Sequence, residues 1–515
     1  MSLSVPENDV REHLPIQKLL VWASVASCLI VIATLLQRAV PTFVWSLASV
    51  GVLTVVVVQI YKKHKALGVL AAPLLFILAT EFVSGIAIEA GAYTTETAEL
   101  GAPTAGFARL SLIYLWCLVA GYCVASRSLD EFSTRLCRTY EQSDDRWNAG
   151  AVVVLLLGGL TVAYMAIVGI TNGFPLIAGI DRFYFRVNED AIYATVMDNR
   201  FVLAYALGIV VLDRRGQLAG IAIFVAMLGL SVLYAEKFGS IVQMLMAVAT
   251  PTALLRIAKE GKLPKALAAN VFFLIGVITV PATIIVYGGA KDRGAAIQRT
   301  VDRVVNQGQM WFSADRKYGQ WVAWDSRVIT ADVKSWCGLT PQTPENAGLR
   351  FGQYYAMAAV APIDHVYENI KTGNGYALNL LPYALIVSGW VGAMVVGIVT
   401  SVTIAVTLRE MMYAICTRYW IGLFLAAKIL LWQVSGFVEG YMWLIVGYKT
   451  LLAIGLLVGL RLVRERLLSR RLMPAAAQQP VLEIINRATL WRSRPNEPSN
   501  RVETSAVSGA VRWRT

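Results

Sequence analysis

Long apolar runs separated by short polar segments occupy most of the chain between residues 19 and 463. Each run is close to the roughly 20 residues that an α-helix needs to cross a bilayer, and runs of that length predict membrane-spanning helices. The expected fold is therefore an all-α polytopic membrane protein. We expect about twelve spans, near residues 19–37, 42–60, 66–87, 108–125, 149–170, 191–212, 218–235, 239–256, 266–288, 378–406, 411–436 and 441–463.

Basic residues in the short loops predict the orientation. Lys and Arg gather in residues 61–65, 213–215 and 259–265, which fall on one side of the membrane in this arrangement. Because cytoplasmic loops carry the excess of Lys and Arg, both termini are expected in the cytoplasm, as residues 1–18 and a basic tail at 464–515. The membrane domain then covers 19–463, with extracytoplasmic loops at 88–107, 171–199 and 289–377.

Composition excludes several other classes. Of 515 residues, 57% are hydrophobic and 15% charged, against about 45–50% and about 25% in soluble domains. The net charge is +13, but residues 461–515 alone hold eleven Arg and four Glu, or +7. A basic segment after a membrane helix is typical of cytoplasmic retention and contact with lipid headgroups, so no nucleic-acid partner is expected.

No resident metal or cofactor is expected. Three histidines cannot supply a common zinc site, and the six cysteines show neither zinc nor disulfide spacing. No phosphate-binding loop, dinucleotide fingerprint or nucleophile elbow stands in a suitable strand–helix context.

The loop at 289–377 is about ninety residues long, well beyond ordinary connections, so it should have a structure of its own. Residues 295–312 predict an amphipathic helix. Its apolar face would comprise Ile297, Val301, Val304, Val305, Gly308, Trp311 and Phe312.

Three arginines in the loop at 171–199 and just after it could bind an anion. Arg182 and Arg186 are four positions apart, so they would share a helix face and could clamp one polyanion; a solvated face is the alternative. The apolar run that follows Arg200, residues 201–212, is too short to span, so its helix should begin earlier and place Arg200 within the outer leaflet. The alternative is that Arg200 extends to the headgroups beside Asp198.

Further polar candidates follow along the chain. Lys237 lies in the short connection between two apolar runs, close to a helix start near Gly239 that would favour an anion; a tight turn with a solvated Lys–Glu pair is the alternative. The large loop adds Arg299, Arg303, Arg350 and Asn374.

His365 is the one histidine that this orientation places outside the cytoplasm. Histidine suits general-base chemistry near neutral pH, and Asp364 and Glu368 flank it, although a lone surface histidine is the alternative. Three further ionisable residues, Glu81, Lys428 and Lys449, lie within apolar spans. A structural ion pair between Glu81 and a lysine is the first interpretation, and a proton or substrate pathway is the second.

Several of these segments together carry a family resemblance, which extends over residues 150–440. They are the Arg-rich loop at 181–200, the Lys-Phe-Gly-Ser segment at 237–240, the helix at 303–311, the loop end at 372–376 and the Gly-Trp-Val-Gly segment at 389–392. In this layout the chain resembles the bacterial O-antigen and oligosaccharide repeat-unit polymerases, within the O-antigen ligase-like superfamily.

That resemblance implies a metal-independent membrane glycosyltransferase of the bacterial inner membrane, without a cofactor. It would polymerise oligosaccharide repeat units carried on undecaprenyl diphosphate at the extracytoplasmic face, with membrane lipids around it and a chain-length regulator protein as a candidate partner. His365 and Arg200 would be catalytic. The residues that would bind substrate or diphosphate are Arg182, Arg186, Lys237, Arg299, Arg303, Arg350, Glu368 and Asn374.

Three alternatives remain at this point. O-antigen ligases share the layout and are the nearest confusable activity. Polyprenyl-phosphate-sugar transferases have an acidic pair in the first outer loop, whereas residues 37–41, the first outer loop here, contain no acidic residue. A twelve-span transporter or flippase would be built from two similar halves, and no internal repeat is evident in this sequence.

Overall fold

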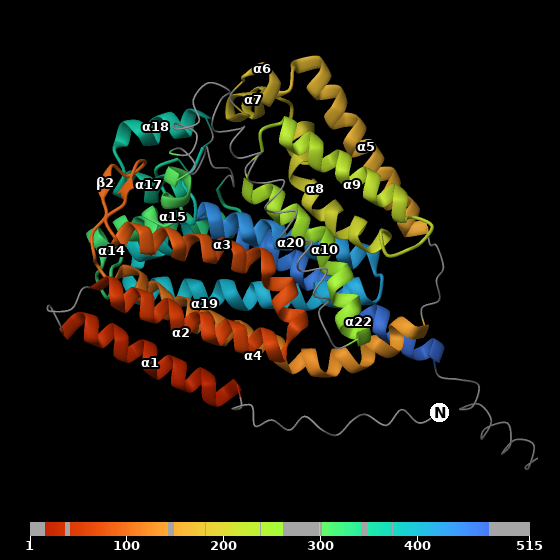
Figure 1. Cartoon of the computed structure of the whole chain (residues 1–515), viewed down its shortest axis with the longest axis horizontal. Coiled ribbons are helices and arrows are strands. Elements are labelled where there is room, and N and C mark those ends of the chain that lie inside the picture. Colours follow the sequence, from red (N-terminus) through yellow and green to blue (C-terminus); the bar gives the residue numbers. More distant parts are fainter. Residues whose placement is uncertain are drawn as a thin grey trace, which may run out of the picture. The chain divides into compact units, whose positions relative to one another are not determined.

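The computed structural model describes residues 16–36, 42–142, 149–180, 182–236, 238–260, 298, 301–340, 348–372 and 374–472. The chain is an all-α polytopic membrane protein (Figure 1): nine helices among these residues are long and apolar enough to cross a membrane. They are α1 (Ile16–Leu36), α2 (Thr42–Lys63), α3 (Lys65–Glu89), α4 (Gly106–Gln142), α5 (Ala149–Asn172), α10 (Phe238–Glu260), α19 (Leu380–Cys416), α20 (Trp420–Glu439) and α22 (Tyr448–Leu472).

Two further expected spans are helical, and one lies outside the described residues. The spans expected at 191–212 and 218–235 form α8 (Ala191–Val210) and α9 (Gln217–Leu233), each shorter or more polar than the nine. The span expected at 266–288 cannot be compared, because those residues are not among the described ones.

The spans expected at 378–406 and 411–436 have different boundaries in the structure. A polar stretch at 407–410 suggests a loop between them, but α19 is helical through this stretch to Cys416 and α20 begins at Trp420. Glu410 is 1% exposed and pairs with Arg409 at 2.9 Å, so the polar stretch is neutralised inside the helix. The single break in α19 lies instead at Gly389, with φ 71° and ψ −168°.

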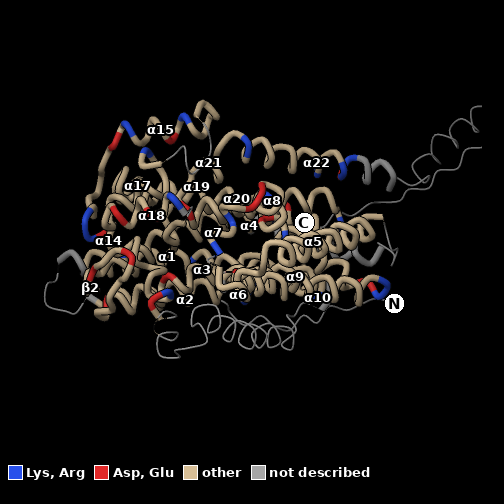
Figure 2. Tube along the Cα trace, turned by 90° about the horizontal axis from the view of Figure 1, so that it is seen from above, with Lys and Arg blue, Asp and Glu red and all other residues tan. Residues whose placement is uncertain are grey.

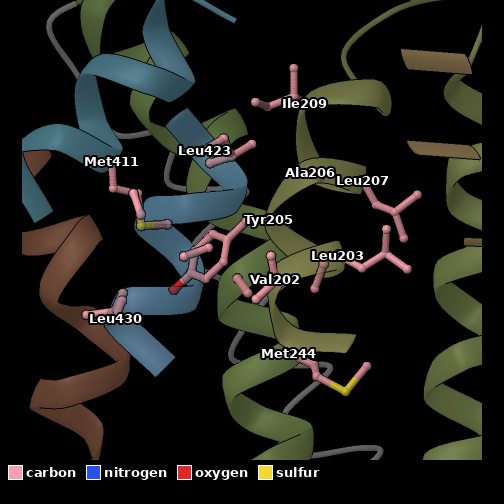
Figure 3. Close-up of a cluster of buried hydrophobic side chains, with 14 of the residues drawn as sticks. Val202, Leu203, Tyr205, Ala206, Leu207, Ile209, Met244, Met411, Leu423 and Leu430 are labelled. Carbon is pink, nitrogen blue, oxygen red and sulfur yellow. The ribbon is translucent and has the colours of Figure 1, made fainter. Parts of the chain in front are cut away.

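The helices pack into two apolar cores within residues 1–458, one of the two units into which contacts divide the chain. One core joins α5, α8, α9, α10 and α20 with the second half of α19. Figure 3 shows part of it, where Tyr205 extends from one side of α8 toward Leu430, and Leu203 and Leu207 extend from the other side. Every residue of α8 from 202 to 210 is buried, so α8 is enclosed by its neighbours on all sides along that stretch.

The other core joins α1, α2, α4 and the first half of α19 to the large loop. Within that loop lie α14 (Gln309–Tyr318), α15 (Ser326–Trp336), α17 (Gln353–Val360) and α18 (Ile363–Thr372); α6 (Pro175–Ala178), α7 (Arg182–Asn188) and α21 (Trp443–Val446) are short helices elsewhere. Between α3 and α4 the described residues also form a small antiparallel pair, β1 (Tyr93–Thr94) with β2 (Glu99–Leu100).

The large loop has a structure of its own and is fastened to the α3–α4 connection. Lys317 pairs with Glu99 at 2.8 Å, and the Trp311 indole donates to the Gly106 carbonyl at 2.9 Å. Figure 2 shows the long helices almost free of Lys, Arg, Asp and Glu along their bodies, whereas such residues mark α14 and α15. Polar contacts therefore hold the loop on the apolar helices.

The amphipathic helix expected at 295–312 is interrupted. Residues 301–305 are helical, the chain turns at 306–308, and α14 starts at Gln309; residues 295–297 and 299–300 lie outside the described ones. Val301 and Val304 are 48% and 42% exposed, so the expected apolar face is wrong at these two positions. The turn follows from a tertiary contact, because the Gly308 amide donates to the Ser84 hydroxyl of α3 at 2.7 Å.

Candidate functional site

The candidate site lies where α7, the first half of α8 and the turn after α9 meet. An aromatic cluster fixes α7 there: Phe185 lies 5.6 Å from Tyr193 and 5.7 Å from Tyr234 between ring centroids. The start of α8 is capped by Asp190, whose carboxylate accepts the Tyr193 amide at 2.7 Å. The short helix and the first turns of α8 therefore present their polar residues from a rigid base.

Arg200 is the most deeply buried cation of the site. Its helix does begin well before it, at Ala191, as the short apolar run predicts, and the residue is only 3% exposed. One terminal nitrogen pairs with the Glu236 carboxylate at 2.9 Å and the other donates to the Ser231 hydroxyl at 3.0 Å. The Nε of Arg200 is buried without a hydrogen-bond partner. Arg200 thus faces the protein interior, which contradicts the alternative of extension beside Asp198.

Arg182 and Arg186 extend the cationic surroundings of Glu236. Arg182 donates to the Ala235 carbonyl at 2.9 Å, and Arg186 pairs with Asp198 at 2.9 Å in a contact whose two side chains are each about half exposed. Burial opposes ionisation of Glu236, but the charges of Arg200, Arg182 and Arg186 outweigh burial and lower its pKa. The positive field of the three arginines therefore converges on one carboxylate.

The expected ion pair between Glu81 and a lysine is not formed. Glu81 accepts a hydrogen bond from the Tyr114 hydroxyl at 2.6 Å, because Tyr114 of α4 faces α3 at that level. Lys428 instead donates to the Asn199 side chain at 2.8 Å, which places α20 beside the arginine site. The Lys449 ammonium lies 5.8 Å from the Tyr448 ring centroid.

His365 and Glu368 lie on α18, and both side chains are exposed, as is Asp364. Val366 is fully buried and anchors this helix to the large loop. Figure 1 shows α18 near α7, and residues of these two helices are in contact. The helix with the candidate base therefore neighbours the helix with Arg182 and Arg186.

The other expected site residues are distributed elsewhere. Arg303 pairs with Glu96 at 3.4 Å, in the part of the loop fastened to the α3–α4 connection. Arg350 is exposed in the turn before α17, and the Asn374 backbone carbonyl accepts from the Gln353 side-chain Nε2 at 3.4 Å. Lys237 and Arg299 lie outside the described residues. The structure thus brings together Arg182, Arg186 and Arg200 but gives Arg303 a different partner.

Two residues of the site were not among the expected ones. Ser231 and Glu236 hold Arg200. In the sequence, Ser231 is one serine within an apolar run, and Glu236 is the acidic member of a Lys–Glu pair in a short turn. A buried arginine needs an acidic partner. Glu236 could have been found by looking for an acidic residue in the loops on the same side of the membrane as Arg200. Within the described residues, no group of three or more His, Cys, Asp or Glu side chains could hold a metal ion.

Comparison with known proteins gives one match. Residues 346–454, from just before α17 in the large loop through α19 and α20 to the first turns of α22, match a family of unknown function, DUF6418. No curated protein and no solved structure matches the chain significantly.

Proposed function

We propose that the protein is a glycosyltransferase that polymerises oligosaccharide repeat units carried on undecaprenyl diphosphate. The observation that carries the proposal is a cluster of three arginines: Arg200 pairs with the Glu236 carboxylate, Arg182 donates to the neighbouring Ala235 carbonyl, and Arg186 pairs with Asp198. Three guanidinium groups here face two carboxylates, Glu236 and Asp198, so the site has a cationic excess that suits a diphosphate. The diphosphate of the donor would take over contacts that Glu236 and Asp198 now make.

In the proposed reaction, an acceptor hydroxyl attacks the anomeric carbon of the donor glycan. A new carbon–oxygen bond forms as the bond to the diphosphate breaks, and the leaving diphosphate carries the electron pair. The arginines stabilise the negative charge that grows on the leaving diphosphate. Their interaction with it is stronger in the transition state than in the ground state, so it accelerates the reaction. Arg186 is the most accessible of the three, since its pair with Asp198 is half exposed and easily exchanged.

His365 is the proposed base that takes the hydroxyl proton. It is accessible on α18, and α18 contacts α7, so a glycan that lies between these helices could meet both groups. Glu368, one turn further along the helix, is proposed to hold the sugar or the protonated ring. A positioned base typically contributes about a hundred- to ten-thousand-fold to the rate.

The setting proposed for this reaction is the extracytoplasmic face of the bacterial inner membrane. About twelve spans with both termini in the cytoplasm would place α7, α18 and the large loop on that face. The product would enter surface polysaccharide, and a chain-length regulator protein is the proposed partner.

Single substitutions in the producing bacterium test the proposal. Arg200→Lys, Arg186→Ala and His365→Gln should each shorten or abolish the polymer while the protein stays in the membrane at normal level. Lysine is included because its single ammonium cannot replace the two terminal nitrogens of the Arg200 guanidinium, one of which binds Glu236 and the other Ser231. Arg327→Ala, an exposed arginine on α15, is the matched control and should leave the polymer unchanged. Full-length polymer from both Arg200→Lys and Arg186→Ala would overturn the anion site.

A further inference from the structure

The break in α19 is filled by a segment of the large loop, residues 320–325. At Gly389 the helix loses its regular bonding, and the loop segment replaces it: the Trp390 amide donates to the Gln320 carbonyl at 3.1 Å and the Val391 amide to the Trp321 carbonyl at 3.2 Å. In return, the Asp325 amide donates to the Val387 carbonyl at 3.0 Å. Three backbone groups of this segment, the carbonyls of Gln320 and Trp321 and the amide of Asp325, are therefore bonded to the helix at its break.

Three side chains of the same segment are large, apolar and exposed. Trp321, Val322 and Trp324 are 65%, 68% and 74% exposed. Trp390, beside the break, is by contrast packed edge-on against Trp311, with 5.4 Å between ring centroids. Three such neighbours on one short segment form an apolar projection, which we name the Trp321–Trp324 segment.

The position of this segment along α19 coincides with the expected edge of the bilayer. Residues 380–387 before the break are all buried in the large-loop core. Residues 390–416 after it form about 40 Å of helix at 1.5 Å per residue, enough to cross the roughly 30 Å hydrocarbon layer. A stripe of exposed valines begins directly after the break, with Val391 at 53%, Val395 at 54% and Val399 at 38%.

We propose that the Trp321–Trp324 segment inserts into the membrane interface on the large-loop side and anchors the loop to the lipid surface. The segment continues the exposed valine stripe of a membrane-spanning helix, so lipid is the occupant that covers both. Tryptophan is the side chain that most favours this layer, where its ring meets acyl chains and its indole N–H meets headgroups. The proposal is independent of the enzymatic activity proposed above.

Spin labelling in lipid nanodiscs tests it. With the native cysteines replaced, labels are placed at Val322→Cys and, as a control, at Ile363→Cys on α18, which is 44% exposed. Collisions with oxygen should exceed those with a water-soluble nickel chelate at 322, and the order should reverse at 363. Preferential contact with the nickel chelate at 322 would overturn the proposal, and so would dipolar broadening at 322, which would indicate a second copy of the chain.

A second measurement retains the native cysteines. Brominated phosphatidylcholine quenches tryptophan fluorescence near the bromine atoms, so the double variant Trp321→Phe/Trp324→Phe should lose a substantial part of the quenchable emission of the wild-type protein. Phenylalanine keeps the segment apolar and is expected to preserve its fold. An undiminished quenchable fraction would show that neither ring contacts lipid and would contradict the proposal.

Discussion

The ion pair between Arg109 and Asp315 offers the sharpest test of how the large loop is fastened. Asp315, on α14, is 4% exposed and accepts bonds from two nitrogens of Arg109, with Nε at 3.2 Å. The Arg109 side chain is 19% exposed and donates in addition to the Thr104 carbonyl at 3.2 Å. Asp315→Asn removes one charge and leaves the arginine without the carboxylate that is bonded to it.

The structure suggests the size of the effect. Breaking a buried pair by removing one partner typically costs about 3–5 kcal/mol. Arg109 keeps the Thr104 carbonyl and some access to water, so we expect the lower end, about 3 kcal/mol, which is roughly a hundred-fold or more in the opening equilibrium of α14. The exposed Arg186–Asp198 pair provides the contrast, since such pairs are worth about 0–1 kcal/mol.

Amide hydrogen exchange in nanodiscs measures this opening directly. Exchange in α14 should accelerate by about a hundred-fold in Asp315→Asn, whereas Asp198→Asn should change exchange in α7 and α8 by less than about fivefold. Adding Arg109→Gln to Asp315→Asn removes the unpaired charge and should restore part of the protection. If α14 exchanged within about fivefold of the wild-type rate in Asp315→Asn, the pair would not hold the loop in this way.

Three further predictions concern the break in α19, the loop and the topology. Gly389→Ala should strongly reduce the yield of folded protein in detergent, because a Cβ would lie 2.7 Å from the Ala323 amide in a glycine-only conformation, while Gly229→Ala, with open space around it, should fold normally. Burial raises the pKa of Asp332 from 3.8 to about 6 against the opposing hydrogen bonds from Tyr383 and Trp336, so the neutral acid stabilises the fold. Protection of α15, taken relative to the intrinsic exchange rate at each pH, should therefore increase as pH falls through 6 toward 4, and this increment should be lost as pH rises through 6. The profile of Asp332→Asn should be flat, and a flat wild-type profile would refute this. Cysteine labels placed after residues 95 and 340 should react with impermeant reagents from outside, and one at 140 should not; a protected label at 340 would remove His365 from the proposed site.

The long helices could be predicted from the sequence because each needs only a local property, a sufficiently long apolar run. The burial of Arg200 also followed from a local argument, since residues 201–212 are too short to span a bilayer. Its partners did not follow. Ser231 and Glu236 meet Arg200 only once α8, α9 and α10 pack together, and Glu81 finds Tyr114 rather than a lysine for the same reason.

Breaks in helices were the other feature beyond the reach of periodicity. The apolar pattern around Gly389 is compatible with an unbroken helix, and the interruption depends on backbone bonds from residues 320–325, far away in the chain. The turn at 306–308 likewise depends on the Ser84 hydroxyl of α3. A hydrophobic pattern indicates which face of a helix is apolar. It does not indicate which distant segment will form hydrogen bonds with the backbone groups of that helix.

The measurement that tests the proposed function most directly is the lipid-linked glycan content of the producing bacterium after deletion of this gene. The proposed polymerase activity predicts that single repeat units on undecaprenyl diphosphate accumulate on the outer face of the membrane and that long polymer disappears. Both changes should be reversed by the wild-type protein and by Arg327→Ala, but not by Arg200→Lys. Unchanged polymer length, or repeat units that accumulate only on the cytoplasmic face, would contradict a polymerase; the latter result would identify a flippase.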